Sequence, residues 1–155
     1  MTTNPSADSP SADTLRKLHS ARARSAYERA VAACRHAGIA PDAAQTVPTT
    51  PVGRAANALR LSAQSLTALA GTAPDPAADA RCARNAAATA ALAAQVAAQM
   101  ARSGAATALR AALTASQAAA KAAGGTAAGQ DTALNAIADD AEEGAVEAAR
   151  AAGWM

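Results

Sequence analysis

Apolar and polar residues follow one another along most of the chain with the period of an α-helix, and the period of two that marks a strand is not seen. The clearest apolar seam recurs every seven residues, at Val52, Leu59 and Leu66. Thr50 fits the N-cap of this helix, Pro51 its first turn and Gly71 its end. The pattern predicts a helix over about 51–70.

Residues 75–125 form an alanine-rich stretch, in which close to half of the positions are alanine. Alanine is the strongest helix former because it loses no side-chain entropy in a helix. In an unbroken helix, the large apolar residues before and after Ser103-Gly104 would lie on faces rotated by roughly 120°. We therefore expect a break there and two helices, over about 76–102 and 105–123; one bent helix is the alternative.

Two further helices are expected near the ends of the chain, over about 13–37 and 131–152. Ser11 and Asp13 are candidate N-caps of the first. Its apolar residues share one broad arc of the helix: Leu15, Ala23, Ala26, Tyr27, Ala30, Val31, Ala33 and Cys34. Leu18 falls outside this arc. Residues 1–10 are rich in Ser, Thr and Pro, lack the features of a signal peptide, and are predicted to form a disordered tail.

The last helix is predicted to have an apolar face and an acidic face. The apolar face comprises Leu134, Ile137, Ala138, Ala141, Ala145, Ala148 and Ala152. The acidic residues are expected on the opposite, solvated side: Asp139, Asp140, Glu142, Glu143 and Glu147.

The fold class that follows is all-α, an alanine-rich antiparallel bundle of four or five helices in one domain over 11–155. Only about twenty larger apolar side chains are present, and there is no Phe. Alanine faces let helix axes approach near the lower end of the usual range of about 8–10 Å, which compensates for this thin core. A homodimer or docking onto another protein would be physically natural for such a core.

Charge is divided unevenly along the chain. Residues 14–84 hold ten Lys or Arg against four Asp or Glu, whereas residues 131–155 hold one against six. We expect the first and last helices to lie side by side and to attract each other. Exposed pairs between them would make the melting temperature sensitive to salt.

Nucleic-acid binding is the runner-up function, because basic residues crowd the first helix. The candidate phosphate contacts are Arg16, Lys17, Arg22, Arg24, Arg29 and Arg35. Such a helix can bind phosphates without sequence preference, but these side chains spread around its circumference and no helix-turn-helix spacing follows. The alanine and arginine excess is typical of a GC-rich bacterial genome. On composition alone, this alternative would be an accessory protein of a mobile element such as a plasmid.

Metal, cofactor and catalytic motifs are not found, so we expect a non-enzymatic protein without cofactor or small-molecule substrate. The soft metal ligands His19, Cys34, His36 and Cys82 do not have zinc-site spacing. No phosphate-binding loop or nucleophile motif is present. The longest uncharged run, residues 85–101, is short of the ~20 apolar residues of a membrane span. A cytoplasmic location is therefore expected.

The function that this build favours is protein–protein interaction, as a scaffold in an unknown process. Trp154 is a candidate partner anchor, because Trp is enriched among residues that dominate interface energies. With equal weight, Trp154 could instead fold back and cap the bundle.

Overall fold

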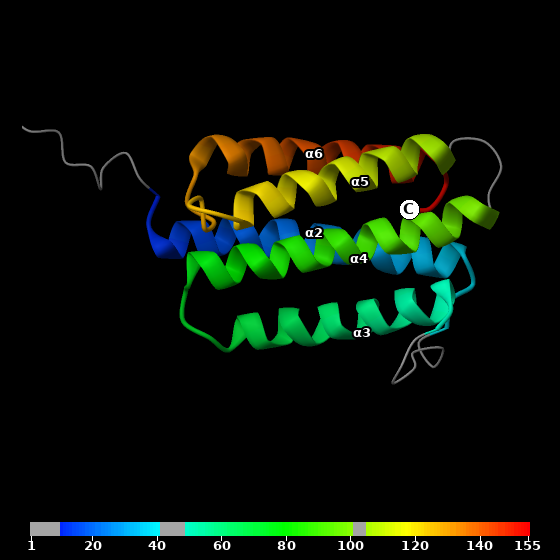
Figure 1. Cartoon of the computed structure of the whole chain (residues 1–155), viewed down its shortest axis with the longest axis horizontal. Coiled ribbons are helices and arrows are strands. Elements are labelled where there is room, and N and C mark those ends of the chain that lie inside the picture. Colours follow the sequence, from blue (N-terminus) through cyan, green and yellow to red (C-terminus); the bar gives the residue numbers. More distant parts are fainter. Residues whose placement is uncertain (1–9, 41–48, 101–104) are drawn as a thin grey trace, which may run out of the picture.

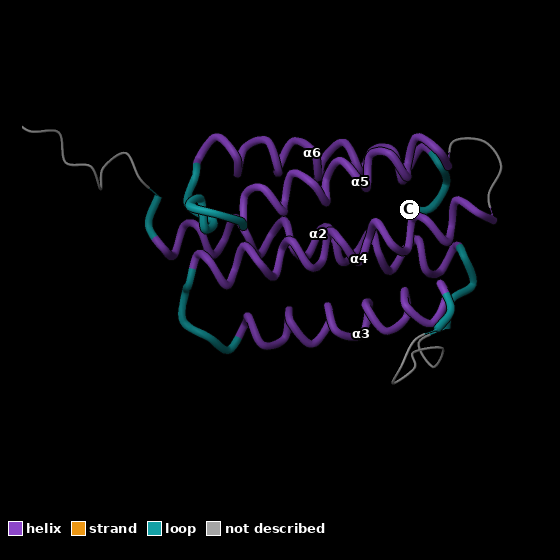
Figure 2. The backbone as a smooth tube through the Cα atoms, viewed as in Figure 1, coloured by secondary structure: helices purple, strands orange, loops and turns teal. Residues whose placement is uncertain are grey.

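A computed structural model describes residues 10–40, 49–100 and 105–155 of the chain. Within these ranges the protein is made of helices joined by turns and loops, with no strand (Figure 2). The helices are α2 (Ala12–His36), α3 (Pro51–Ala70), α4 (Pro76–Met100), α5 (Ala105–Ala123) and α6 (Thr132–Ala151) (Figure 1). The all-α prediction is confirmed, with bounds within two residues of those expected.

Four helices begin at N-termini with a side-chain hydrogen bond, and two of these caps, Ser11 and Thr50, are the ones named above. In each, a side-chain oxygen accepts a hydrogen bond from a backbone N–H three residues on: Ser11 from Thr14 at 3.1 Å, Thr50 from Gly53 at 3.0 Å, Asp75 from Ala78 at 3.4 Å and Asp131 from Leu134 at 2.9 Å. Each cap satisfies one of the N–H groups that a helix start leaves without an intrahelical partner. The caps therefore fix where these helices start.

The alanine-rich stretch forms two helices and not one bent helix. α4 ends at Met100 and α5 starts at Ala105, and α5 runs back antiparallel to α4 (Figure 1). The predicted break at Ser103-Gly104 lies outside the described residues, as does all of the expected tail except Pro10.

Four helices close into a ring and the fifth lies outside it. The ring contacts are α2 with α4, α4 with α5, α5 with α6, and α6 with α2. α3 packs only against α2 and α4, on one side of the ring (Figure 1). Helices that follow each other in sequence are antiparallel, whereas α2 runs parallel to both α4 and α6 (Figure 1). α2 is thus in contact with three of the other four helices.

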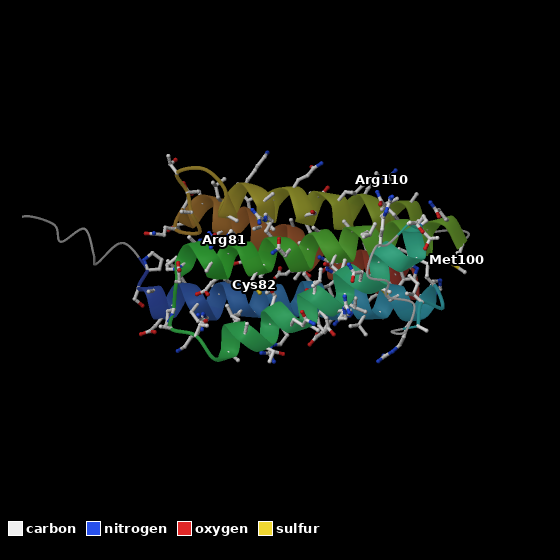
Figure 3. The ribbon with its side chains drawn as sticks, turned by 60° about the horizontal axis from the view of Figure 1, so that its bottom comes forward. Arg81, Cys82, Met100 and Arg110 are labelled. Atoms are coloured by element: carbon white, nitrogen blue, oxygen red, sulfur yellow. The ribbon has the colours of Figure 1, made fainter. Side chains whose placement is uncertain are left out.

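The core between α2 and α4 is built mainly from alanine. Its fully buried members are Ala23, Ala26, Ala83 and Ala86, with Leu69 of α3 and Cys82 of α4 packed on them. Neighbouring residues on α4 face opposite environments, since Cys82 is buried while Arg81 is exposed (Figure 3). Alanine faces allow the close helix approach that the sequence predicts.

The predicted faces of the last helix are partly wrong. Ala138 and Ala145 are buried as expected, but Ile137 is 57% exposed and Glu142 only 5% exposed. α2 presents buried arginines toward α6, and a buried cation requires a counter-charge. α6 therefore turns Glu142 inward at the expense of Ile137.

Candidate functional site

The six cations of α2 are divided equally between those paired within the fold and those exposed on the surface. Three are held by groups within the fold: Arg16, Arg22 and Arg29. Three are exposed: Lys17, Arg24 and Arg35. Only half of the candidate phosphate contacts are therefore free of partners within the fold.

Arg29 makes the closest ion pair of the α2–α6 contact. Its Nε and Nη2 donate to the two carboxylate oxygens of Glu142, both at 2.6 Å, and its side chain is 4% exposed. Ser25 Oγ donates a third hydrogen bond to Glu142, at 2.8 Å. Bidentate, charge-assisted geometry of this kind offsets the cost of desolvating both charges. The expected attraction between the first and last helices is thus a buried contact.

Arg22 and His19 form a second buried polar cluster between these helices. Arg22 Nη2 donates to His19 Nδ1 at 2.8 Å, and Arg22 Nε lies 3.3 Å from an oxygen of Asp139. His19 Nε2 lies 2.8 Å from the carbonyl oxygen of Gly129, which can only accept, so the ring carries its proton on Nε2. Burial lowers the pKa of His19, and the nearby Arg22 lowers it further. The ring is therefore neutral at pH 7.

Burial and charge shift the pKa values of Arg22 and Asp139 in opposite directions. Burial lowers the pKa of Arg22, while Asp139 raises it. Burial likewise raises the pKa of Asp139, and Arg22 lowers it. Arg22 and Asp139 thus each stabilise the charged form of the other.

The turn after α5 approaches α4 so closely that it needs glycine. Gly129 has φ +81°, and a Cβ there would collide with the Pro76 carbonyl and the Ala80 side chain. The Gly129 carbonyl accepts from His19 and also from Asn135 Nδ2, at 3.1 Å. This turn consequently joins α2, α4 and α6 at one end of the bundle.

Arg16 fastens α2 to the turn between α3 and α4. Its Nε donates to Asp79 at 2.7 Å, and its Nη1 donates to the carbonyl oxygens of Leu69 and Thr72, at 2.8 and 2.9 Å. Nη2 donates to the Ala73 carbonyl at 2.8 Å. The hydrogen bond to Asp79 raises the pKa of Arg16. Leu69 lies in the last turn of α3 and Thr72 and Ala73 follow it, so Arg16 connects α2 to the end of α3 and to the turn after it.

Trp154 folds back onto the bundle, as one of the two expected alternatives has it. Its side chain is 8% exposed and belongs to the main core cluster. Its backbone N–H donates to Ala149 O at 2.9 Å, and its ring centroid is 6.0 Å from that of His36. The indole Nε1 is buried and has no hydrogen-bond partner.

Two adjoining pockets run along the exposed side of α2. One, of about 560 Å³, lies against α3, and the other, of about 550 Å³, lies against the C-terminal segment; both are lined by Tyr27 and Glu28. We call these two pockets the α2 groove, and its main residues are Arg24, Tyr27, Glu28, Val31, Arg35, Leu66, Trp154 and Met155. The only Tyr and the only Trp of the sequence both line it.

Sequence reasoning missed the α2 groove because it placed Tyr27 and Val31 within the apolar arc of the first helix. Both are only half-buried, at the edge of that arc. The two exposed arginines of the groove, Arg24 and Arg35, were identified but assigned to phosphate binding. The signal that could have located the groove is the combination of Tyr27 with these arginines on neighbouring turns.

The soft metal ligands differ in their exposure. His19, Cys34 and Cys82 are buried and His36 is exposed. Over residues 10–40, 49–100 and 105–155, no group of three or more His, Cys, Asp or Glu could hold a metal ion. Burial raises the pKa of Cys34 to about 11 and also raises that of Cys82, so both thiols are protonated at neutral pH.

No helix in the described ranges is long and apolar enough to cross a membrane. Comparisons of the chain with protein-family models, curated proteins and solved structures give no significant match.

Proposed function

We propose that this chain is a non-enzymatic helical interaction protein whose α2 groove binds an acidic amphipathic helix of a partner protein. The observation that carries the proposal is the grouping of Tyr27 and Trp154 with two exposed arginines in one groove. The protonated, buried thiols of Cys34 and Cys82 support the non-enzymatic part, because the thiolate is the reactive form.

The residue types of the groove support a protein ligand. Tyr, Trp and Arg are the residues that most often dominate interface energies, and Tyr27, Trp154 and Arg35 line one pocket. An amphipathic helix binds by placing apolar side chains from successive turns into such a groove. The two adjoining pockets match this requirement, with Leu66 in one and Val31 in the other.

The charges of the groove support an acidic ligand. Arg24 and Arg35 are exposed in it, and Glu28 is its one acidic lining residue. A partner carboxylate that pairs with Arg24 or Arg35 makes charge-assisted hydrogen bonds, which are stronger than neutral ones.

A photo-cross-linking amino acid at Tyr27, used in the source cell, tests the proposal. The matched control is the same substitution at Leu61, which is exposed on α3 and does not line the groove. We expect a cross-link at position 27 to an acidic segment with helical apolar spacing, and none at position 61. A nucleic-acid adduct, or a second copy of this chain, would contradict the proposed partner.

Charge reversal then tests the contact with the purified partner. Arg24→Glu with Arg35→Glu should weaken binding at least tenfold, since each loses an opposite charge and gains a like one. Arg81→Glu with Arg110→Glu is the control, because these exposed arginines lie on α4 and α5 and do not line the groove (Figure 3). Equal losses of affinity in the two double variants would contradict the assignment of the binding site to the groove.

Nucleic-acid binding is the weaker candidate. Of its six proposed contacts, Arg16, Arg22 and Arg29 are already held within the fold. Lys17, Arg24 and Arg35 remain for phosphates, with Glu28 among them. Duplex binding at low salt that is lost in Arg24→Glu with Arg35→Glu would favour this alternative over a protein partner.

A further inference from the structure

We infer that the outer face of α5 and α6 binds a second copy of this chain, with α5 of each copy lying on α6 of the other. The two helices lie side by side across the bundle from α3, and neither lines the α2 groove (Figure 1). We call this surface the α5–α6 face. Its main residues, all exposed, are Arg110, Leu113 and Gln117 on α5, and Ile137, Gly144 and Glu147 on α6.

The two helices of the α5–α6 face carry opposite charges. α5 has two exposed cations, Arg110 and Lys121, and no acidic residue along its length. α6 has one exposed cation, Arg150, against three exposed acids: Asp140, Glu143 and Glu147. Within the described ranges, none of these six side chains forms a salt bridge. The α5 of a second copy therefore offers α6 the opposite charges that its own chain does not supply.

The heights of the exposed residues along the bundle show how two copies fit. α5 and α6 are antiparallel neighbours, and Ala118 and Ala122 of α5 pack with Ala138 of α6. Each step forward along α5 is therefore matched by a step back along α6. In this register, exposed residues of the two helices lie at the same height within one residue, in complementary pairs: Arg110 with Glu147, Leu113 with Gly144, Gln117 with Asp140 and Ala120 with Ile137.

Symmetry brings these pairs together between two copies. A twofold axis parallel to the helices, lying between the two faces, keeps every residue at its height and places α5 of one copy on α6 of the other. Arg110 of each copy then lies opposite Glu147 of its partner. A twofold axis across the helices would instead place α6 on α6, where the exposed acids face like charges. Charge therefore selects the first arrangement, which closes as a dimer.

The uncharged residues of the face fit the same arrangement. Ile137 is 57% exposed and Leu113 is 36% exposed. Gly144 lies inside α6, where glycine is less favourable than alanine, and nothing lies within 4 Å of a Cβ built on it. No contact within the described part of the chain thus requires glycine at this position. In the dimer, Gly144 gives room to the partner's Leu113 and lets the two helices approach closely.

Charge reversal in two separate chains tests this arrangement. Arg110→Glu alone and Glu147→Arg alone should each weaken the dimer by roughly tenfold or more, because each puts like charges at both symmetric contacts. An equimolar mixture of the two variants should recover the natural affinity, since each contact then joins a glutamate to an arginine. Mixing cannot restore a pair within one chain, so recovery identifies a contact between copies. Sedimentation equilibrium of the full chain at up to about 100 μM measures these dissociation constants.

Arg24→Glu with Arg35→Glu, in the α2 groove, is the control and should leave the dimer unchanged. A circular dichroism melt shows whether each variant folds. A natural chain that stays monomeric at this concentration would overturn the inference, as would a mixture that dimerises no more tightly than either variant alone. A dimer lost in the groove variant would also overturn it, because the contact between copies would then lie in the α2 groove.

Discussion

α2 contacts α4 and α6 through two interfaces of opposite character. Against α4 it packs alanine on alanine, with Ala23, Ala26 and Ala86 fully buried. Against α6 it places buried polar groups, of which Arg29 with Glu142 is the closest pair. The alanine interface permits close approach, whereas the polar interface requires particular residues to face each other.

This difference has a physical consequence for how the fold is specified. Alanine faces look alike after a shift of one helical turn, so they do not distinguish one register from the next. A buried arginine, in contrast, is costly in every register that leaves it without a carboxylate. We therefore attribute the close packing to the alanine interface and the register to the buried Arg29–Glu142 pair, the closest one between α2 and α6.

The largest expected effect comes from removing one partner of the buried pair. Glu142→Ala leaves Arg29 buried without a counter-charge, and we expect a loss of about 3–5 kcal/mol in the free energy of unfolding. Urea denaturation followed at 222 nm measures it. The control is Glu143→Ala at the exposed neighbouring position, where the change should stay within about 0.5 kcal/mol. Equal effects of the two variants would mean that Arg29 does not depend on Glu142.

Enlarging one side chain of the alanine interface tests whether close approach of the helices is required. Ala86→Leu places extra atoms where the exposed fraction is zero, so the helices must move apart, at a cost of about 1–3 kcal/mol. Ala88→Leu, exposed on the same helix, should change stability by less than about 0.5 kcal/mol. Both are measured by urea denaturation. A tolerated Ala86→Leu would show that close approach is not required.

Acid should weaken the polar interface through His19. Its pKa is lowered in the folded state, so as pH falls below about 6.5 the unfolded chain takes up the proton first and stability falls. The slope should reach up to about 1.4 kcal/mol per pH unit. Arg22 and Asp79 both act on this ring, and the raised pKa of Asp139 has the opposite sign. The test compares the unfolding free energy of the natural chain and of His19→Gln from pH 7 to pH 5.

In His19→Gln the titrating ring is replaced by an amide that can still donate to Gly129. The pH slope should flatten, whatever the absolute stability of this variant. An unchanged slope would exclude His19 as its source.

The smallest effect is expected from salt. The sequence favours exposed pairs and a salt-sensitive melt, but the structure buries Arg29 and Glu142, where screening is weak. Raising NaCl from about 0.05 to about 1 M should shift the melting temperature by no more than about 2 °C. A larger fall in the melting temperature would indicate that the α2–α6 pairs are open to solvent.

Most of the fold follows from local signals in the sequence. The helices start at Ser11, Thr50 and Asp131 because these side chains cap the backbone, and capping depends on neighbours a few residues away. Alanine propensity predicts the helices of the long central stretch in the same local way.

The polar interface could not be predicted in this way, because a helical wheel places every charge outward. Arg22 and Arg29 point inward only because Asp139 and Glu142 lie on a helix far away in sequence. Which of several neighbouring carboxylates faces Arg29 depends on the rotation of α6, a tertiary property. Predicting the α2 groove also requires the tertiary structure, since Trp154 reaches it only after the chain turns at Gly153, with φ +79°.

The most direct test of the central claim uses Arg29→Met with Glu142→Leu. Replacing a buried ion pair by apolar residues is often neutral in stability, so this variant should remain helical. Spin labels at the exposed positions Arg24 and Glu147, with Cys34 and Cys82 replaced by alanine in both chains, report the α2–α6 distance by pulsed electron resonance. We expect one narrow distance distribution with the ion pair and a broad or multiple one without it. An equally narrow distribution, at the same distance, in the apolar variant would contradict the claim that the buried ion pair sets the register.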